Sequence, residues 1–143
     1  MNRKRVFIDT WGWVALGHQT DNRHQEIVSL YKDWLRRGAV IYTSDFVLDE
    51  TVTLLFRREI FEEAIRFMEG IFLAAKGGRI TVERVTSNRF ASAWNLRKLF
   101  DDKTLISFTD LTTMAIMKEL KIKEILTDDK HFLQIGMNFK KLP

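Results

Sequence analysis

Short apolar segments alternate with longer amphipathic segments along the whole chain, and this alternation is the strongest constraint on the fold. Residues 6–8 are continuously apolar (Val-Phe-Ile), as in a strand that is buried on both faces of a sheet. Residues 22–37 repeat apolar side chains every three or four positions, as in an amphipathic helix, and Gly38 then suits the helix end. Strands that alternate with helices in this way form a parallel sheet, because each helix carries the chain back across it.

The same alternation continues to the end of the sequence. We expect further strands at 40–42, 80–82, 124–127 and 138–140, and helices at 11–17, 44–58, 60–76, 87–100 and 109–120. Helix 44–58 begins at Ser44 or Asp45, and strand 80–82 is less apolar, so we place it near an edge of the sheet. No linker or repeat interrupts the pattern. We therefore predict one α/β domain over residues 1–143, a three-layer fold whose central sheet of four to five strands is mostly parallel and has helices on both faces.

The residue types that are missing exclude several kinds of chemistry. The chain has no Cys, which excludes disulfides, iron–sulfur clusters and a thiol nucleophile, and its three His lack the spacing of zinc ligands. No apolar run is long enough for a signal-peptide core or a membrane span. We therefore expect a cytoplasmic protein without a membrane partner. The net charge of +4 favours a polyanionic partner only weakly.

Acidic residues follow two of the predicted strands directly. Asp9 comes after strand 6–8, and Asp128 and Asp129 come after strand 124–127. Ligands of parallel sheets bind beyond the carboxyl ends of the strands, so these acids can meet at one edge. Each acid also suits a structural role, because Asp9 can cap the helix that follows it and Asp128 or Asp129 can cap the turn before His131.

Two further acids lie on predicted helices. Glu50 shares a helical face with Val47 and Leu54, where a carboxylate is costly unless it is paired. The alternative is that Glu50 lies at the rim of this apolar stripe. Asp110 shares a face with Met114, and it also fits a capping box that begins at Ser107. An acid in the first turn suits the helix dipole and can still face a cleft.

Four acids that converged on one pocket would repel one another unless a hard cation neutralised them. Mg²⁺ and Mn²⁺ prefer oxygen ligands, and such a site can polarise a phosphate and activate water without a His, Cys or Ser nucleophile. The missing residue types agree with this chemistry. From the residues alone, the fourth acid is either Asp128 or Asp129.

The ordered set of these motifs resembles a PIN domain, and within that superfamily it is similar to the VapC-type ribonuclease toxins of toxin–antitoxin pairs. The motifs are Phe7-Ile8-Asp9-Thr10, Asp49-Glu50, Ser107-Phe108-Thr109-Asp110 and Thr127-Asp128-Asp129-Lys130-His131-Phe132. Each motif alone is weak, but the set covers nearly the whole chain in the expected order.

The resemblance implies a Mg²⁺- or Mn²⁺-dependent endoribonuclease whose catalytic and metal-binding residues are Asp9, Glu50, Asp110 and Asp129. In the family's last motif a Thr and an aromatic residue bracket the acid, as Thr127 and Phe132 do here, which places it on Asp129. Asp128 departs from the family, which usually has an uncharged residue there. Thr10, Thr127 and Asp128 are expected to support the site. The resemblance also implies a homodimer and a cognate antitoxin.

RNA binding would require cations near the acids. Arg57 and Arg58 lie two helical turns beyond Glu50 and are our candidates for phosphate contacts. Trp11 either stacks on an RNA base or is buried together with Trp13. Two alternatives to the toxin remain open, namely a catalytically silent PIN-fold module that binds RNA or protein, and a housekeeping RNA-processing nuclease.

Overall fold

The computed structural model describes residues 3–143, which contain one five-stranded sheet. Its strands are β1 (Arg5–Ile8), β2 (Val40–Ser44), β3 (Ile80–Glu83), β4 (Glu124–Leu126) and β5 (Lys140–Leu142). They lie in the order β3-β2-β1-β4-β5, and every neighbouring pair is parallel. The sheet is therefore parallel throughout, and β3 lies at an edge as predicted.

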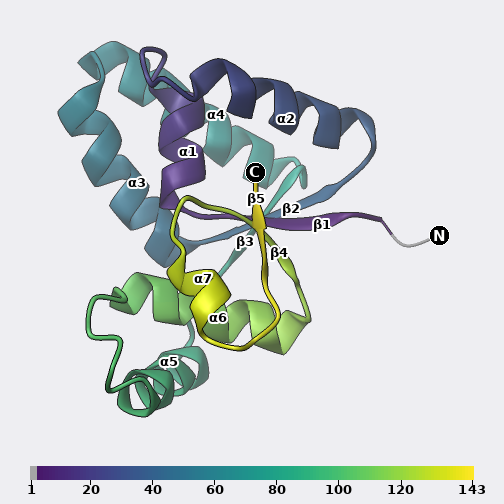
Figure 1. The fold of residues 1–143 in the computed structure, drawn as a ribbon. Coiled ribbons are helices and arrows are strands. Elements are labelled where there is room, and N and C mark those ends of the chain that lie inside the picture. The colour runs from purple at the N-terminus through teal and green to yellow at the C-terminus, as the bar shows by residue number, and fades with distance from the viewer. Residues whose placement is uncertain (1–2) are drawn as a thin grey trace.

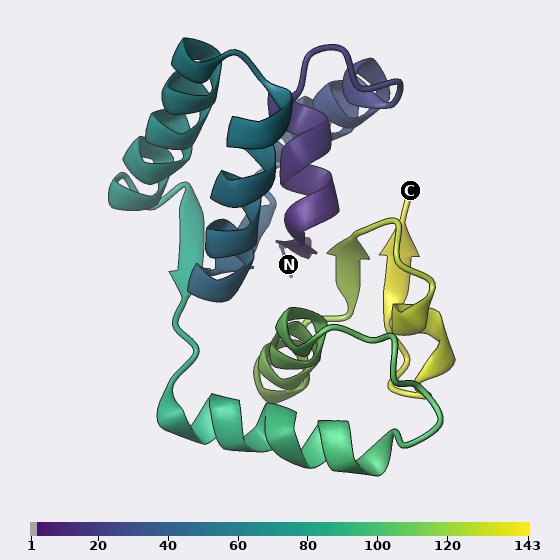
Figure 2. The same ribbon diagram turned by 90° about the vertical axis from the view of Figure 1, so that its left-hand side faces the viewer.

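Within residues 3–143, seven helices accompany the sheet: α1 (Thr10–Gly17), α2 (His24–Arg36), α3 (Asp45–Arg58), α4 (Phe61–Lys76), α5 (Ser87–Leu99), α6 (Phe108–Leu120) and α7 (His131–Gln134). Figures 1 and 2 show α1 to α4 on one side of the sheet and α5 and α6 on the other. This arrangement confirms the predicted three-layer α/β fold. No helix in the described part of the chain is long and apolar enough to cross a membrane.

The chain after β4 differs from the sequence-based expectation. The last strand lies at 140–142 and not at 138–140, because Asn138 adopts a left-handed backbone conformation (φ 60°) that cannot belong to a strand. Residues 131–134 form the short helix α7, which our sequence-based assignment did not include. A helix of four residues is barely longer than one turn, so it leaves no periodic pattern in the sequence.

Several helices begin at side-chain caps that the sequence contains. Ser44 caps α3, since its Oγ accepts a hydrogen bond from the Val47 amide at 3.1 Å. This decides between Ser44 and Asp45. The Asp45 carboxylate accepts instead from the Val85 amide at 3.0 Å, which ties the start of α3 to the segment after β3.

Helix α1 is held on the sheet by buried hydrogen bonds. The indole Nε1 of Trp13 donates to Thr43 Oγ1 at 2.9 Å, and the Thr43 hydroxyl donates to the Ile8 carbonyl at 3.0 Å. Trp13 and Thr43 are both buried. These bonds join α1 to β2 and to the last residue of β1, so they also fix the residue that follows β1, Asp9. Trp13 therefore belongs to the core.

Gly12 allows α1 to approach the sheet closely. A Cβ atom at this position would lie 2.8 Å from Ile8 Cγ2 and 2.8 Å from Leu126 Cδ2. Both contacts are below the normal separation of carbon atoms, and both side chains are completely buried. Any larger residue at position 12 would displace the Ile8 or the Leu126 side chain from the ends of β1 and β4.

We expect Gly12→Ala to lower the free energy of unfolding by about 1–3 kcal/mol, because the added methyl group overpacks the core. Gly70→Ala on α4 is the matched control, since a Cβ atom there would meet no other atom within 4 Å. The control should raise the free energy of unfolding by about 0.5–1 kcal/mol through helix propensity. Urea unfolding measures both changes, and a Gly12→Ala protein as stable as wild type would contradict the close approach.

Candidate active site

The candidate site lies where the connections of the sheet change direction. From β1 the chain leads to β2 on one side, whereas β4 and β5 lie on the other side of β1. Such a switch point opens a crevice beyond the carboxyl ends of the two central strands, here β1 and β4. Asp9 follows β1 and Thr127 follows β4. The Asp9 amide donates to the Leu126 carbonyl at 3.2 Å, so the two strand ends are directly joined.

A cavity of about 510 Å³ occupies this position, and the structure brings almost all the predicted site residues to its wall. The lining includes the four acids proposed for the metal, the three supporting residues and one of the two arginines: Asp9, Thr10, Glu50, Arg58, Asp110, Thr127, Asp128 and Asp129. Arg57 does not line the cavity and is exposed on α3. Residues that are up to 120 positions apart in the sequence therefore share one cavity.

Asp9 is both a helix cap and a cavity residue. Its Oδ1 accepts a hydrogen bond from the Gly12 amide at 3.3 Å, and the residue is only 6% exposed. Burial raises the pKa of its carboxyl from the ordinary 3.8 to about 7, although hydrogen bonds from the Thr127 side chain and two backbone amides favour the charged form. Asp9 therefore caps α1 and lines the cavity at the same time.

Glu50 lies at the rim of the apolar stripe of α3 and lines the cavity from there. The buried residues of this helix are Val47, Leu48, Thr51 and Leu55, and Glu50 is partly exposed beside them. Its Oε1 accepts a hydrogen bond from the Thr10 hydroxyl. Thr10 therefore positions the carboxylate of a helix that is forty residues away in the sequence.

Asp110 and Asp129 form a coupled pair of carboxyls. Burial raises the pKa of Asp110 to about 9, and its hydrogen bond with Asp129 and the negative charges of Asp9, Asp129 and Glu50 act in the same direction. Burial opposes ionisation of Asp129 as well, but hydrogen bonds from Asp110 and from the His131 amide (2.8 Å) outweigh it and lower the pKa of Asp129. Ionisation of one carboxyl therefore opposes ionisation of the other, and the pair loses its two protons in separate steps.

Asp128 and Asp129 differ in how their side chains are held. The Asp129 amide donates to Thr127 Oγ1 at 3.0 Å, and its carboxylate receives the His131 amide. Asp129 is partly buried beside Asp110, whereas Asp128 is exposed on the same cavity. His131 Nδ1 also lies 2.8 Å from Asp129 Oδ1, but without hydrogen-bond geometry. The local contacts favour Asp129 as the fourth acid.

Asp21 and Ser107 also line the cavity, and the sequence interpretation gave neither a place in the site. Asp21 lies between α1 and α2, where a single acid in a polar loop carries no signal. Ser107 Oγ accepts from the Asp110 amide at 3.0 Å, so the expected cap of α6 is also part of the cavity wall. Trp11 is half-buried in that wall, and the guanidinium of Arg23 lies 5.4 Å from its ring centre.

The donor set fits a divalent cation by its chemistry. No three His, Cys, Asp or Glu side chains among residues 3–143 stand close enough together to form a ready-made metal cluster. The available donors are nevertheless all carboxylate and hydroxyl oxygens, as Mg²⁺ and Mn²⁺ prefer. Burial is the main cause of the raised pKa values of Asp9 and Asp110, and a cation bound beside them would offset the cost of ionising these carboxyls.

A pH-dependent stability follows from these carboxyls. Unfolded Asp side chains lose their protons near pH 4, whereas the folded chain holds those of Asp9 and Asp110 up to about pH 7 and about pH 9. Between these limits the folded state binds more protons than the unfolded state, so stability falls as the pH rises. In EDTA we expect Asp110→Asn to be about 1–3 kcal/mol more stable than wild type at pH 8, and about equal to it at pH 4.

Thermal unfolding at both pH values measures this difference. Asp49→Asn is the matched control, because Asp49 is exposed on α3 and does not line the cavity. Mg²⁺ should stabilise wild type more than Asp110→Asn. An Asp110→Asn effect of the same size at both pH values would contradict the electrostatic explanation.

Known proteins share both the sequence and the fold. Residues 6–137 match the PIN domain family. The chain is 33% identical over 135 residues to the 23S rRNA-specific endonuclease VapC20 of Mycobacterium tuberculosis. The aligned region covers 92% of this chain and 94% of the relative. The crystal structure of that VapC20, described as a sarcin-ricin loop cleaving toxin, superposes with a TM-score of 0.78, covering 92% of this chain and 95% of that one.

A more distant structure shares the fold alone. VapBC2 from Rickettsia felis, solved bound to a DNA fragment from its promoter, superposes with a TM-score of 0.69 at 18% identity and covers 96% of this chain and 97% of that one. The superposition over nearly the whole chain shows that the five-stranded parallel sheet and its helices have the arrangement of these relatives. The chain therefore belongs to the PIN domain family and is similar to its VapC-type members.

Proposed function

We propose that this protein is a divalent-cation-dependent endoribonuclease of the VapC type, which hydrolyses phosphodiester bonds in RNA. The observation that carries the proposal is the single cavity at the switch point, where Asp9, Glu50, Asp110 and Asp129 come together from four separate segments. Its second support is the 33% identity to an endonuclease over 92% of the chain. VapC20 is named for 23S rRNA, and we propose a structured RNA of this class as the substrate.

The acids of the cavity would hold one or two Mg²⁺ or Mn²⁺ ions. When bound, such a cation polarises a phosphate and lowers the pKa of water. Asp9 is kept in place by the Gly12 amide and Glu50 by the Thr10 hydroxyl, so both carboxylates are positioned before any ligand arrives. The proton held by Asp110 must leave when a cation binds, which makes cation binding stronger at higher pH. Arg58 lines the same cavity and is suited to a phosphate oxygen.

Matched substitutions on α3 test the carboxylate mechanism. We expect Glu50→Gln to reduce Mg²⁺-dependent RNA cleavage by about 10²–10³-fold, because the amide keeps the shape but loses the charge. Asp49→Asn removes the same charge from the next residue, outside the cavity, and should cleave like wild type. Asp9→Asn and Asp110→Asn should also fold and lose cleavage. Product formation from a structured RNA is measured with Mg²⁺ and with EDTA.

The outcomes separate the competing functions. If Glu50→Gln or Asp110→Asn keeps full Mg²⁺-dependent cleavage, the four-acid mechanism is wrong. If wild type binds the RNA and does not cleave it with any divalent cation, the protein is a silent binding module. An isolated gene, without a neighbouring frame for an antitoxin, would favour a housekeeping nuclease over a toxin.

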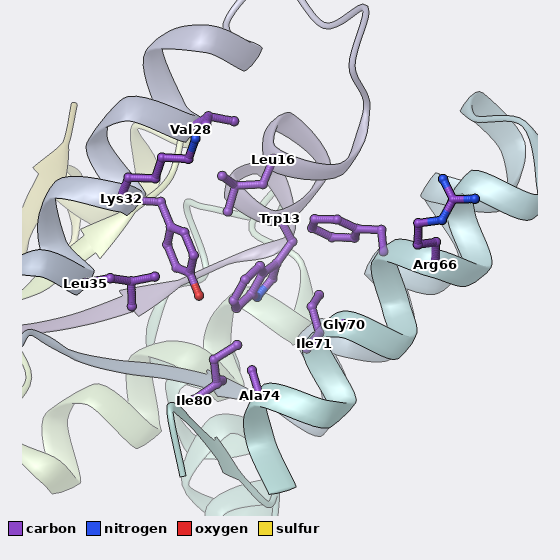
Figure 3. Close-up of a pocket in the computed structure, with 12 residues that line it drawn as sticks. Trp13, Leu16, Val28, Lys32, Leu35, Arg66, Gly70, Ile71, Ala74 and Ile80 are labelled. Carbon is purple, nitrogen blue, oxygen red and sulfur yellow. The ribbon is translucent and has the colours of Figure 1, made fainter. Parts of the chain in front are cut away.

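We further propose that an antitoxin protein binds this chain, since the 33%-identical relative is described as a toxin. An apolar cavity of about 440 Å³ between α1, α2 and α4 is a suitable surface. Figure 3 shows Trp13 and Leu16 of α1 facing Leu35 of α2 and Ile71 of α4 across it. The charged residues of its lining are Lys32 and Arg66, so an amphipathic helix with acidic flanks would complement it.

A bulky side chain at Gly70 would occupy this apolar cavity. Gly70 lines the cavity, and a Cβ atom there would meet no other atom within 4 Å. We expect Gly70→Trp to keep RNA cleavage. It should weaken inhibition by the cognate antitoxin by about 100-fold, because the indole ring takes the place of the antitoxin's side chains. Inhibitor titrations measure this, with Gly70→Ala as the control. Unchanged inhibition of Gly70→Trp would place the antitoxin elsewhere.

A homodimer remains a proposal as well. Apolar side chains are exposed where α3 leads into α4, among them Phe56, Ile60 and Phe61. The rings of Phe56 and Phe61 lie 5.3 Å apart at an angle of 73°, so they form one continuous apolar surface. A second copy of the chain could cover this surface.

A further inference from the structure

Basic residues gather at the end of the sheet where the strands begin. At least two basic residues lie within four positions of the first residue of every strand. They are Arg3, Lys4 and Arg5 for β1, Arg36 and Arg37 for β2, Lys76 and Arg79 for β3, Lys121 and Lys123 for β4, and Lys140 and Lys141 for β5. Because all five strands are parallel, these residues share one edge of the sheet, which we call the amino edge. The acidic cavity lies at the opposite, carboxyl edge.

A second polar cavity is formed at the amino edge. Its volume is about 670 Å³, and its charged lining consists of five cations, Arg3, Lys4, Arg5, Lys121 and Lys123, and one acid, Glu124. The acid is already paired, because Glu124 Oε2 lies 2.6 Å from Lys4 Nζ. The cavity therefore carries a strong positive charge that its own walls do not neutralise.

The two arginines of this cavity contact β2 and the loop that precedes it. Arg3 Nε donates to the Gly38 carbonyl at 2.6 Å, and the Arg5 guanidinium lies 5.3 Å from the ring centre of Tyr42. Lys121 and Lys123 are exposed, and no residue from 3 to 143 forms an ion pair with their ammonium groups. The site thus combines positioned guanidinium groups with free ammonium groups.

Helix dipoles account for only some of these cations. Arg36 and Lys76 lie in the last turns of α2 and α4, where a positive charge stabilises the helix end. Arg3, Arg5 and Lys123 belong to no helix. Their concentration around a cavity requires another explanation, and a concave set of guanidinium and ammonium groups is suited to phosphodiester oxygens.

We propose that the amino edge is a second RNA-binding surface, which holds a segment of the RNA away from the bond that is cut. The choice of RNA as ligand rests on the proposed function. Strands of three to five residues span about 10–17 Å, so the two edges are close enough for different segments of one folded RNA to reach both. A surface of this kind would favour large structured RNAs over short oligonucleotides.

Binding without cleavage tests the proposal independently of catalysis. A labelled RNA hairpin of about thirty nucleotides is titrated in EDTA over a range of KCl concentrations, with the double variant Lys121→Gln/Lys123→Gln. We expect its Kd to rise about tenfold at 0.1 M salt, and the slope of log Kd against log salt to fall by about 1.5. Arg3→Gln is an independent variant of the same cavity, with an expected loss of about fivefold.

The control variant loses the same charge elsewhere. Arg84→Gln/Lys98→Gln removes two exposed cations, one after β3 and one on α5, that lie outside the amino-edge cavity and form no ion pair with any residue from 3 to 143. This variant should bind the hairpin within about twofold of wild type. Circular dichroism confirms that each variant is folded.

The possible outcomes distinguish this proposal from the proposed nuclease activity. Wild-type affinity and salt slope in both amino-edge variants would overturn the proposal, even if the protein cleaves RNA. An equal loss in the control would show a general charge effect and would also overturn it. A loss for duplex DNA as large as for RNA would overturn RNA as the dedicated ligand. Edge-dependent hairpin binding by a protein that never cleaves would support the surface and refute the nuclease.

Discussion

The buried hydrogen bonds from Trp13 through Thr43 to the Ile8 carbonyl are the interaction on which the site depends most. They hold the first turn of α1 against the ends of β1 and β2, and the missing side chain of Gly12 lets this turn come close. Asp9 and Thr10 belong to that same turn. Their carboxylate and hydroxyl are therefore positioned by the core of the domain, and not by a flexible loop.

The parallel sheet also explains how one small domain can assemble several acids. All carboxyl ends of its strands lie at one edge, so each connection that leaves this edge can contribute a side chain to the same cavity. The electrostatic cost appears in the raised pKa values of Asp9 and Asp110. Protons reduce this cost, so the stability of the domain depends on pH.

Much of this arrangement was predictable because it depends on local patterns. Apolar runs and helical periodicity located the strands and long helices, and the strand-end rule brought Asp9 and Asp129 together. The order of the strands was not accessible from one sequence, because pairing between distant segments leaves no local pattern. Asp21 was not predicted to line the cavity, because a single acid in a polar loop leaves no pattern in the sequence. The last strand was placed two residues too early, since nothing in the sequence indicated the left-handed conformation of Asn138.

The acids of the carboxyl-edge cavity and the cations of the amino-edge cavity lie at opposite ends of the strands, and this separation contributes an electric dipole along the sheet. In the field of a polyanion such a dipole would experience a torque, which would turn the amino edge toward the polyanion before contact. The acidic cavity would then face away during the first encounter. Neutralising the charge of that cavity would weaken the dipole, and the molecule would then have a weaker preferred orientation. The charge at one end of the strands would thus influence how the whole molecule approaches a polyanion.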